Sequence, residues 1–366
     1  MNYKSILNLI GILLAIFSFA FIPPLIVTFI YEEPLSEIFL YSFLFLISLG
    51  GLMWFISRQK GLPLNISDGF IITTMFWIVL ACAGSIPFYF FGLSFNDAIF
   101  ESVSGITTTG ATLIVGLDDL PKSLLLYRQL LQWIGGMGLI ILAVAVMPAL
   151  GIGGSQLYKM ELPGSHGNQK LTPKITDSAK ALWKIYFGLT LACALLYILS
   201  GMDIFDAIAH SLSTVAGGGF STHDKSIGFF DSGLIEAVCI IFMLLSAASF
   251  AVHYAAIFGG KPLRYFYDSE FRFFLTVVMS IVLITLIFHT ISNSYADILL
   301  TLRASIFHTV SIVTTSGFTT ENFSLWPSFL PYLLLVGAFM GACSQSVGGG
   351  IKTWRVLIML NQAYKE

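Results

Sequence analysis

Long apolar stretches alternate with short polar segments along the whole chain. Most of these stretches match the ~17–25 residues that a helix needs to cross a bilayer. They lie at 4–31, 36–57, 70–92, 123–150, 180–201, 233–258, 272–292 and, shorter than the rest, 329–343. The pattern predicts an all-α polytopic membrane protein. Because the apolar run after Lys4 is longer than the core of a signal peptide, we expect a retained first helix.

Three short segments between these stretches repeat one pattern. Each carries a brief semi-polar helix and ends in a turn of small residues centred on Gly110, Gly219 or Gly317. When the segments are aligned on that glycine, each has a serine six residues earlier and an acidic residue or a histidine nine residues earlier. The serines are Ser104, Ser213 and Ser311, and the residues nine positions earlier are Glu101, His210 and His308. A repeat of this kind predicts three equivalent modules with pseudo-symmetry around one axis.

The short helices cannot cross a membrane, so each is expected to enter it and return. Non-helical backbone at membrane depth must be buried in protein or line a watery cavity. Glycine adopts at low cost the backbone angles that turn carbonyl oxygens toward an ion, and the carboxyl end of a helix carries partial negative charge. We therefore predict an ion pore lined by main-chain carbonyls. The expected helix caps are Asn96 or Asp97 in the first segment and Asp203 or Asp206 in the second.

The composition agrees with a membrane protein. Of the 366 residues, 56% are hydrophobic and only 10% are charged, against about 25% charged in soluble domains. If the N-terminus is cytoplasmic and the short helices enter from outside, most Lys and Arg lie in the cytoplasm, as the positive-inside rule requires. Most acidic residues then lie outside, where they would concentrate cations. The four cysteines are expected to be reduced packing residues in apolar segments: Cys82, Cys193, Cys239 and Cys343.

The repeats divide the chain into four predicted parts. Residues 1–62 are expected to form a transmembrane hairpin, followed by pore module 1 at 63–165, pore module 2 at 166–265 and pore module 3 at 266–366. Each module consists of an apolar helix, a short re-entrant helix, a turn and a second apolar helix. The most polar stretch, 152–178, is the predicted cytoplasmic link between the first two modules.

Several long motifs resemble the TrkH/KtrB/HKT superfamily of potassium and sodium transporters, and within it the bacterial TrkH family. They are SGITTTGAT from Ser104, YRQLLQWIGGMG from Tyr127, GGFSTHDKSIGFFDS from Gly218 and GGGIK from Gly348. In that superfamily four modules surround one pore, and the carbonyls just before each filter glycine bind K⁺. The resemblance therefore implies K⁺ ligands at Thr108 and Thr109, at Gly217 and Gly218, and at Thr315 and Ser316, each pair followed by Gly110, Gly219 or Gly317.

The resemblance also implies an intramembrane gate loop beneath the filter. Its residues would be Ser344, Gln345, Ser346, Gly348, Gly349 and Gly350. The superfamily usually has a glycine where Gln345 stands, so a long amide there would plug or retune the gate. The other interpretation is a glycine-rich helix end with Gln345 facing solvent.

The expected function is potassium uptake across the bacterial inner membrane by a Trk-type subunit, with Na⁺ or H⁺ symport left open. The resemblance implies a homodimer and a cytoplasmic RCK-type nucleotide-binding regulatory subunit. That subunit would dock on the basic segments 152–184 and 259–272 and near Lys352 and Arg355. We expect membrane lipid around the chain, no cofactor besides the transported ion, and no nucleic acid, because no basic patch exceeds ordinary cytoplasmic anchoring.

The sequence departs from the superfamily in one further respect. A repeat period of roughly 100 residues would place a fourth glycine turn beyond Glu366, so we expect an incomplete four-fold channel fold without a fourth pore module. The alternative function is a non-conducting fragment, or one part of a split transporter that lacks the fourth filter strand. An enzyme is not expected, since the sequence has no HExxH, GxGD, GxSxG or P-loop motif.

Two groups of polar residues lie inside apolar segments. Arg128 and Gln132 share one helix face, and intramembrane charge is a functional candidate. Arg128 also lies near the outer end of its helix, where it would snorkel, and both interpretations stay open. The isolated histidines His210, His253 and His308 are expected to be satisfied interior residues.

Overall fold

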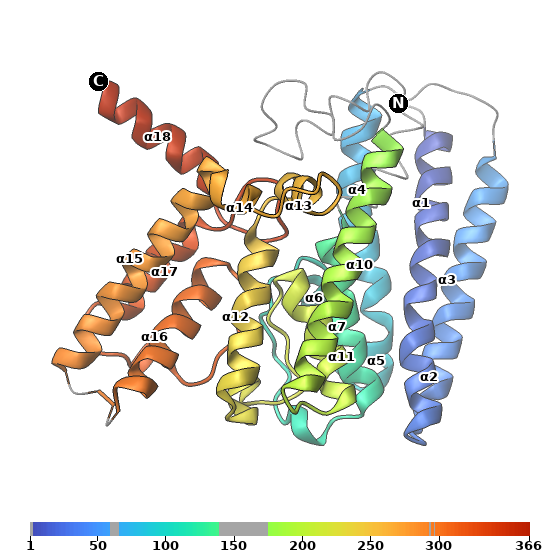
Figure 1. The fold of residues 1–366 in the computed structure, drawn as a ribbon. Helices are drawn as coiled ribbons and strands as arrows, with labels where there is room; N and C mark the ends of the chain where they lie inside the picture. The colour runs from blue at the N-terminus through green and yellow to red at the C-terminus, as the bar shows by residue number, and fades with distance from the viewer. Residues whose placement is uncertain (1–2, 59–65, 139–174, 293, 296) are drawn as a thin grey trace. The chain divides into compact units, whose positions relative to one another are not determined.

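The computed structural model describes residues 3–58, 66–138, 175–292, 294–295 and 297–366. The regular elements in these ranges are all helices, as predicted (Figure 1). They form two compact units, the first containing α1 to α7 and the second containing α10, from Lys180 on, to α18. The predicted link at 152–178 and the second half of the apolar stretch 123–150 lie largely outside the described ranges.

Several described helices are long and apolar enough to cross a membrane. They are Tyr3–Ile30, Ser36–Ser57, Asp68–Phe91, Lys180–Leu199 and Ser269–Ile291. The pair Gly233–Ala247 and Phe250–Ile257 passes the same criterion if it counts as one span, although it is bent by 104°. These helices make the chain a multi-pass membrane protein.

The first unit begins with a helical hairpin. Helix α1 (Tyr3–Ser18) continues through η1 (Phe19–Phe21) into α2 (Ile22–Ile30), and α3 (Ser36–Ser57) returns beside α1 (Figure 1). Gly11 and Gly50 allow this contact. A Cβ on Gly11 would lie 2.7 Å from the carbonyl oxygen of Gly50, and a Cβ on Gly50 would lie 2.6 Å from that of Gly11.

The rest of the first unit holds the first short helix in place. Its elements are α4 (Ile66–Gly84), α5 (Ile86–Phe91), α6 (Phe95–Ile106), η2 (Leu117–Asp119) and α7 (Lys122–Gly136). Helix α6, the first short helix, packs against α4 and α7. Buried Tyr127 on α7 donates a hydrogen bond of 2.7 Å to the carbonyl of Gly84 and packs against the rings of Phe21, Phe39 and Phe88. This cluster ties α7 to the hairpin and to the α4–α5 junction.

The second unit opens with α10 (Ile175–Leu199), the second short helix α11 (Ile204–Ala216) and η4 (Ser226–Phe230). Next come α12 (Gly233–Ala247) and α13 (Phe250–Ile257). The expectation of one continuous helix over 233–258 is wrong, because the chain bends between α12 and α13. Ser249 explains the break, since its side chain caps α13 by accepting a hydrogen bond from the backbone of Ala251.

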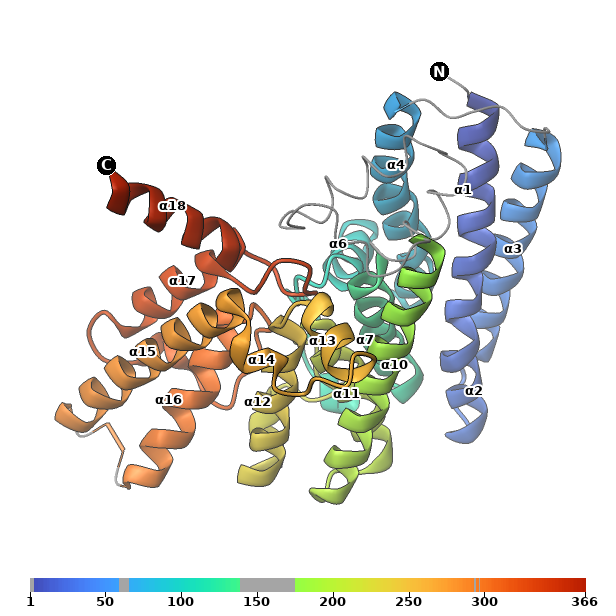
Figure 2. The ribbon, with the colours of Figure 1, turned by 45° about the horizontal axis from the view of Figure 1, so that its top comes forward.

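The remaining elements are α14 (Arg264–Tyr267), α15 (Ser269–Ile291), the third short helix α16 (Ile298–Val313), η5 (Phe323–Leu325), α17 (Leu330–Met340) and α18 (Thr353–Lys365). Helices α15, α16 and α17 lie side by side (Figure 2). Helix α17 stops at Gly341, which has a φ of +69°, and a loop leads to α18. The order of long helix, short helix, turn and second helix thus recurs three times along the chain, while the pseudo-symmetry of the modules in space stays a prediction.

Candidate functional site

The three short helices begin with side-chain caps. Ser94 caps α6 by accepting a hydrogen bond of 3.2 Å from the backbone of Asp97. Asp203 caps α11 and Asp297 caps α16 in the same way, through the backbone N–H groups of Phe205 and Leu299. Asp203 was one of the predicted caps, but the prediction of Asn96 or Asp97 is wrong. The Asp97 carboxylate instead accepts a hydrogen bond of 2.7 Å from the hydroxyl of Ser94, the residue that caps the helix.

Asp206, the other predicted cap of α11, has a different role. Its Oδ1 atom accepts a hydrogen bond of 2.8 Å from the Thr222 hydroxyl, and its Oδ2 atom lies 3.2 Å from Nε2 of His223. Asp206 therefore holds the chain that follows the second glycine turn.

The three turns share an unusual backbone. In each turn the glycine and the residue two positions before it both have a positive φ. The values are +55° and +75° for Thr108 and Gly110, +66° and +76° for Gly217 and Gly219, and +62° and +84° for Thr315 and Gly317. A positive φ is costly for a β-branched residue, and strained backbone of this kind clusters at functional sites. A change of sign at every second residue turns successive carbonyls toward one side of the strand, whereas they alternate in an ordinary extended strand.

The repeated serine fixes this backbone. The hydroxyl of Ser104 donates to the carbonyl of Ala111 at 2.5 Å, and that of Ser311 donates to the carbonyl of Phe318 at 2.6 Å. In both turns the acceptor is the residue directly after the glycine. Ser213 is buried at the equivalent position of the second turn. In the first and third turns the serine therefore ties the end of the short helix to the far side of the turn.

The repeated residue nine positions before the glycine holds the next part of the strand. Glu101 accepts hydrogen bonds of 3.0 and 2.9 Å from the hydroxyl of Thr112. Nε2 of His210 lies 2.9 Å from the hydroxyl oxygen of Ser221, which occupies the same position as Thr112 after its glycine. Nε2 of His308 accepts from the backbone of Thr320 at 3.4 Å. In the first and third short helices the two repeated positions thus act together on the segment that follows the turn.

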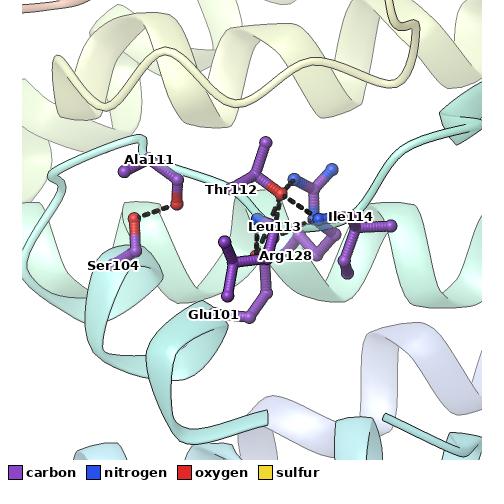
Figure 3. A network of polar contacts seen from close by, with 7 residues as sticks. All are labelled: Glu101, Ser104, Ala111, Thr112, Leu113, Ile114 and Arg128. Atoms are coloured by element: carbon purple, nitrogen blue, oxygen red, sulfur yellow. Dashed lines mark hydrogen bonds and ion pairs between the residues drawn. The ribbon is translucent and has the colours of Figure 1, made fainter. Parts of the chain in front are cut away.

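Arg128 completes the network around the first turn. Its Nε atom lies 2.7 Å from Oε1 of Glu101, and neither side chain is exposed to solvent. A second guanidinium nitrogen donates to the Thr112 hydroxyl at 3.0 Å. Figure 3 shows the Arg128 guanidinium close to Thr112 and Glu101 at the strand that follows the turn. Arg128 therefore does not snorkel, and it supports the backbone of the first turn. Gln132, one turn further along α7, is also buried.

The second and third turns lie against each other within the second unit. A Cβ on Gly219 would lie 2.0 Å from the carbonyl oxygen of Ser316, so only glycine fits there. Further along, the backbone N–H of Gly228 donates to the carbonyl of Thr319 at 3.1 Å. The first turn belongs to the other unit, and the convergence of all three turns stays a prediction.

The predicted gate loop lies between α17 and α18. The hydroxyl oxygen of Thr315, in the third turn, accepts a hydrogen bond of 2.7 Å from the backbone of Gly349. At the other end of the loop, Oε1 of Glu270 on α15 accepts from the backbone N–H groups of Ser344 at 2.5 Å and of Trp354 at 3.1 Å. Sequence reasoning missed Glu270, which looks like an ordinary helix-start acid. The loop is thus fastened both to the third turn and to the start of α15.

Gln345 occupies a position that suits glycine. Its φ is +59°, in the left-handed region that glycine adopts without strain. Its carbonyl accepts a hydrogen bond of 3.0 Å from the backbone of Phe250, directly after the α12–α13 break. The side chain is partly exposed, and whether it plugs the loop stays a prediction.

His210, His253 and His308 are satisfied interior residues, as expected, whereas buried His289 has no hydrogen-bond partner on either ring nitrogen in this structure. Nδ1 of His210 lies 2.9 Å from the carbonyl oxygen of Asp206, and His253 lies within hydrogen-bond distance of the Leu245 carbonyl and the Tyr265 hydroxyl. All four cysteines are free thiols, and Cys82 is exposed while the other three are buried. In the described ranges no group of three or more His, Cys, Asp or Glu side chains could hold a metal ion.

Apolar spans combined with short helices, each ending in a glycine turn of left-handed backbone, are typical of a channel-like membrane transport protein. Comparison with known proteins gives the family. A family model described as TrkH, a cation transport protein, matches residues 35–366. The chain belongs to the TrkH family of cation transport proteins, and the resemblance seen in its motifs is confirmed.

Individual relatives match along the whole chain. The Trk system potassium uptake protein TrkH of Vibrio parahaemolyticus is 47% identical over 371 residues, which cover 100% of this chain and 76% of the relative. The protein of the same name from Escherichia coli K12 is 44% identical, with the same coverage of both chains. The crystal structure of the potassium transporter TrkH from Vibrio parahaemolyticus matches with a TM-score of 0.89 and 45% identity, over 100% of this chain and 76% of that chain. The predicted all-α membrane fold is therefore confirmed.

Proposed function

We propose that this chain is a Trk-type potassium uptake subunit that passes K⁺ through a filter of main-chain carbonyls. The proteins named above, which are potassium transporters, support the ion and the process. The observation that carries the proposal is the pair of left-handed residues repeated in all three turns. Its ligands would be the carbonyls of Thr108, Thr109, Gly217, Gly218, Thr315 and Ser316.

The proposed mechanism is replacement of the ion's hydration shell. Carbonyl oxygens turned to one side of a strand offer K⁺ a substitute for water at several successive sites, each weak enough for the ion to leave. The turns follow the carboxyl ends of α6, α11 and α16, where the partial negative charge of a helix favours a cation. The serine and the Glu or His of each short helix would keep the carbonyls at the spacing that K⁺ requires. Coupling to Na⁺ or H⁺ stays a prediction.

The loop between α17 and α18 would act as the gate beneath this filter. Its hydrogen bond to Thr315 joins it to a proposed ligand residue, and its bonds to Glu270 join it to the beginning of α15. A movement of the segment before α15 would therefore reach the loop through one carboxylate. Ser344, Gln345, Ser346, Gly348, Gly349 and Gly350 would be the moving residues.

The proposal also covers the membrane in which the chain lies and the proteins that it binds. We place the chain in the bacterial inner membrane with a cytoplasmic N-terminus, as a homodimer that binds an RCK-type nucleotide-binding subunit. The basic residues of 259–272 and the exposed helix α18 are the proposed docking region among the described residues. Light scattering of the purified protein tests the dimer, and co-purification with the regulatory subunit encoded in the same genome tests the partner.

The central experiment is ion flux. The purified protein is reconstituted in liposomes loaded with K⁺, and uptake of ⁸⁶Rb⁺ is followed against empty liposomes. We expect uptake that depends on internal K⁺ and is reduced by external K⁺ more than by external Na⁺. Absence of flux from a preparation that remains folded by size-exclusion chromatography and thermal unfolding would contradict conduction by this chain alone.

A further inference from the structure

The side chain of Lys352 folds back onto the proposed gate loop. Its Nζ atom donates hydrogen bonds to the carbonyl oxygen of Gly348 and, at 3.4 Å, to that of Ser346. Lys352 itself has a φ of +81°, which is costly for a residue with a side chain. The chain accepts this strained backbone at the position that brings the ammonium group to the loop carbonyls.

The loop resembles the glycine turns in its backbone chemistry. Gln345 and Gly350, on either side of the two acceptor carbonyls, have φ values of +59° and +84°. Other contacts fix the loop without using these oxygens. Gly349 donates to the Thr315 hydroxyl, and the backbone of Ala342 donates to the carbonyl of Gly349 at 3.2 Å. The carbonyls of Ser346 and Gly348 are therefore held in place for a cation.

We infer that these carbonyls form a monovalent-cation site outside the filter, which the ammonium group of Lys352 occupies in this structure. A lysine ammonium is a compact monovalent cation on a flexible stem, and K⁺ or Rb⁺ satisfies the same oxygens when the ammonium leaves. The ammonium group of Lys352 therefore competes with K⁺ or Rb⁺ from solution for the carbonyl oxygens of the loop. Cation binding at these carbonyls requires only the loop between α17 and α18, whereas a role of this binding in gating rests on the proposed function.

The charges around the site suit one cation. The carboxylate of Glu270 accepts from the backbone at both ends of the loop and supplies negative charge nearby. Asp268, the N-cap of α15, and Arg355, in the first turn of α18, are the other charged groups close to this region. An exchange of ammonium for K⁺ preserves the charge of the site, because both carry one positive charge.

The first experiment compares Lys352→Met with two controls. Lys352→Arg keeps a cation at the loop, and Lys365→Met makes the same change at the exposed end of α18. Equilibrium dialysis measures bound Rb⁺ per protein at constant ionic strength, with N-methylglucamine as the replacing cation. We expect Lys352→Met to bind one Rb⁺ more than the unmodified protein, while both controls bind the same amount as the unmodified protein.

The comparison separates this site from the filter. A gain of one Rb⁺ in Lys352→Met over an unmodified protein that binds none would support the loop site and contradict the proposed filter. No gain in a Lys352→Met protein that is folded by thermal unfolding, or an equal gain in Lys365→Met, would overturn the inference.

A second measurement uses the unmodified chain and does not depend on the folding of a variant. Acetic anhydride acetylates free amines, and peptide mass spectrometry quantifies the modification of Lys352. We expect acetylation of Lys352 to rise several-fold when Rb⁺ replaces N-methylglucamine, while acetylation of Lys365 stays constant. Equal acetylation of Lys352 in both solutions would overturn the inference.

Discussion

Replacement of Arg128 by methionine removes the cation that faces Glu101 inside the first unit. The two side chains are 2.7 Å apart and fully buried. Methionine fills a similar volume but leaves the carboxylate without the guanidinium. The Thr112 hydroxyl would remain as a donor to Glu101, but a neutral hydroxyl does not compensate a buried charge.

The expected cost follows from the burial of the pair. Breaking a buried ion pair by removing one partner costs about 3–5 kcal/mol, because an uncompensated charge stays in a medium of low polarity. That loss is a large share of the ~5–15 kcal/mol by which folded domains are stable. The Arg303–Glu236 pair offers a comparison, since its N–O distance is also 2.7 Å and its carboxylate is also buried, but the arginine side chain is 35% exposed. For Arg303→Met we expect a smaller loss than for Arg128→Met, because water reaches this pair from the arginine side and screens the charge that remains.

The assay is equilibrium unfolding in mixed detergent micelles, measured by tryptophan fluorescence, for Arg128→Met, Arg303→Met and the double variant Glu101→Gln/Arg128→Met. The amide oxygen of glutamine can still accept from Thr112, so the double variant should recover much of the stability lost in Arg128→Met. The reasoning would be refuted if Arg128→Met cost no more than Arg303→Met, or if the double variant were less stable than Arg128→Met.

Two further predictions concern the turns of the second unit. Gly219→Ala should abolish ⁸⁶Rb⁺ uptake, because the new Cβ would lie 2.0 Å from the carbonyl oxygen of Ser316. The control Gly188→Ala, whose Cβ would meet no atom within 4 Å, should leave uptake unchanged. Equal uptake by the two variants would contradict the importance of the close contact. Thr315→Val should cost about 0.5–1.5 kcal/mol by removing the acceptor of the Gly349 N–H. Hydrogen exchange of the loop peptide should then accelerate in Thr315→Val but not in Thr315→Ser, and unchanged exchange in Thr315→Val would show that the bond does not hold the loop.

The sequence predicted the long helices well where apolar length alone decides them. The stretch 36–57 coincides with α3. The stretch 272–292 begins inside α15 (Ser269–Ile291) and ends directly after it. The prediction failed at 233–258, where apolar residues continue through a sharp bend. The bend depends on the Ser249 cap and on a hydrogen bond from Phe250 to the carbonyl of Gln345, a residue far away in the sequence. Hydrophobic periodicity contains no signal for such a contact.

The site was predictable in its positions but not in its contacts. The repeat identified the serines and the Glu or His residues, and the structure gives two of those serines a common acceptor after the glycine. Arg128 remained ambiguous because its partner, Glu101, lies on another helix. Glu270 could not be recognised at all, since an acid in the first turn of a helix is commonplace and its bonds to the loop bridge a large separation in sequence.

The left-handed threonines show why sequence preference alone misjudges such a turn. A β-branched residue at positive φ costs about 1–2 kcal/mol, so glycine would be expected at Thr108 and Thr315, as it is found at Gly217. Steric space does not explain the difference, because a Cβ on Gly217 would meet no atom closer than 3.8 Å. The hydroxyls do explain it, since that of Thr108 donates to the carbonyl of Thr107 at 2.7 Å and that of Thr315 accepts from Gly349. The strain is thus kept where the hydroxyl also holds the backbone, which is the property that the proposed carbonyl ligands need.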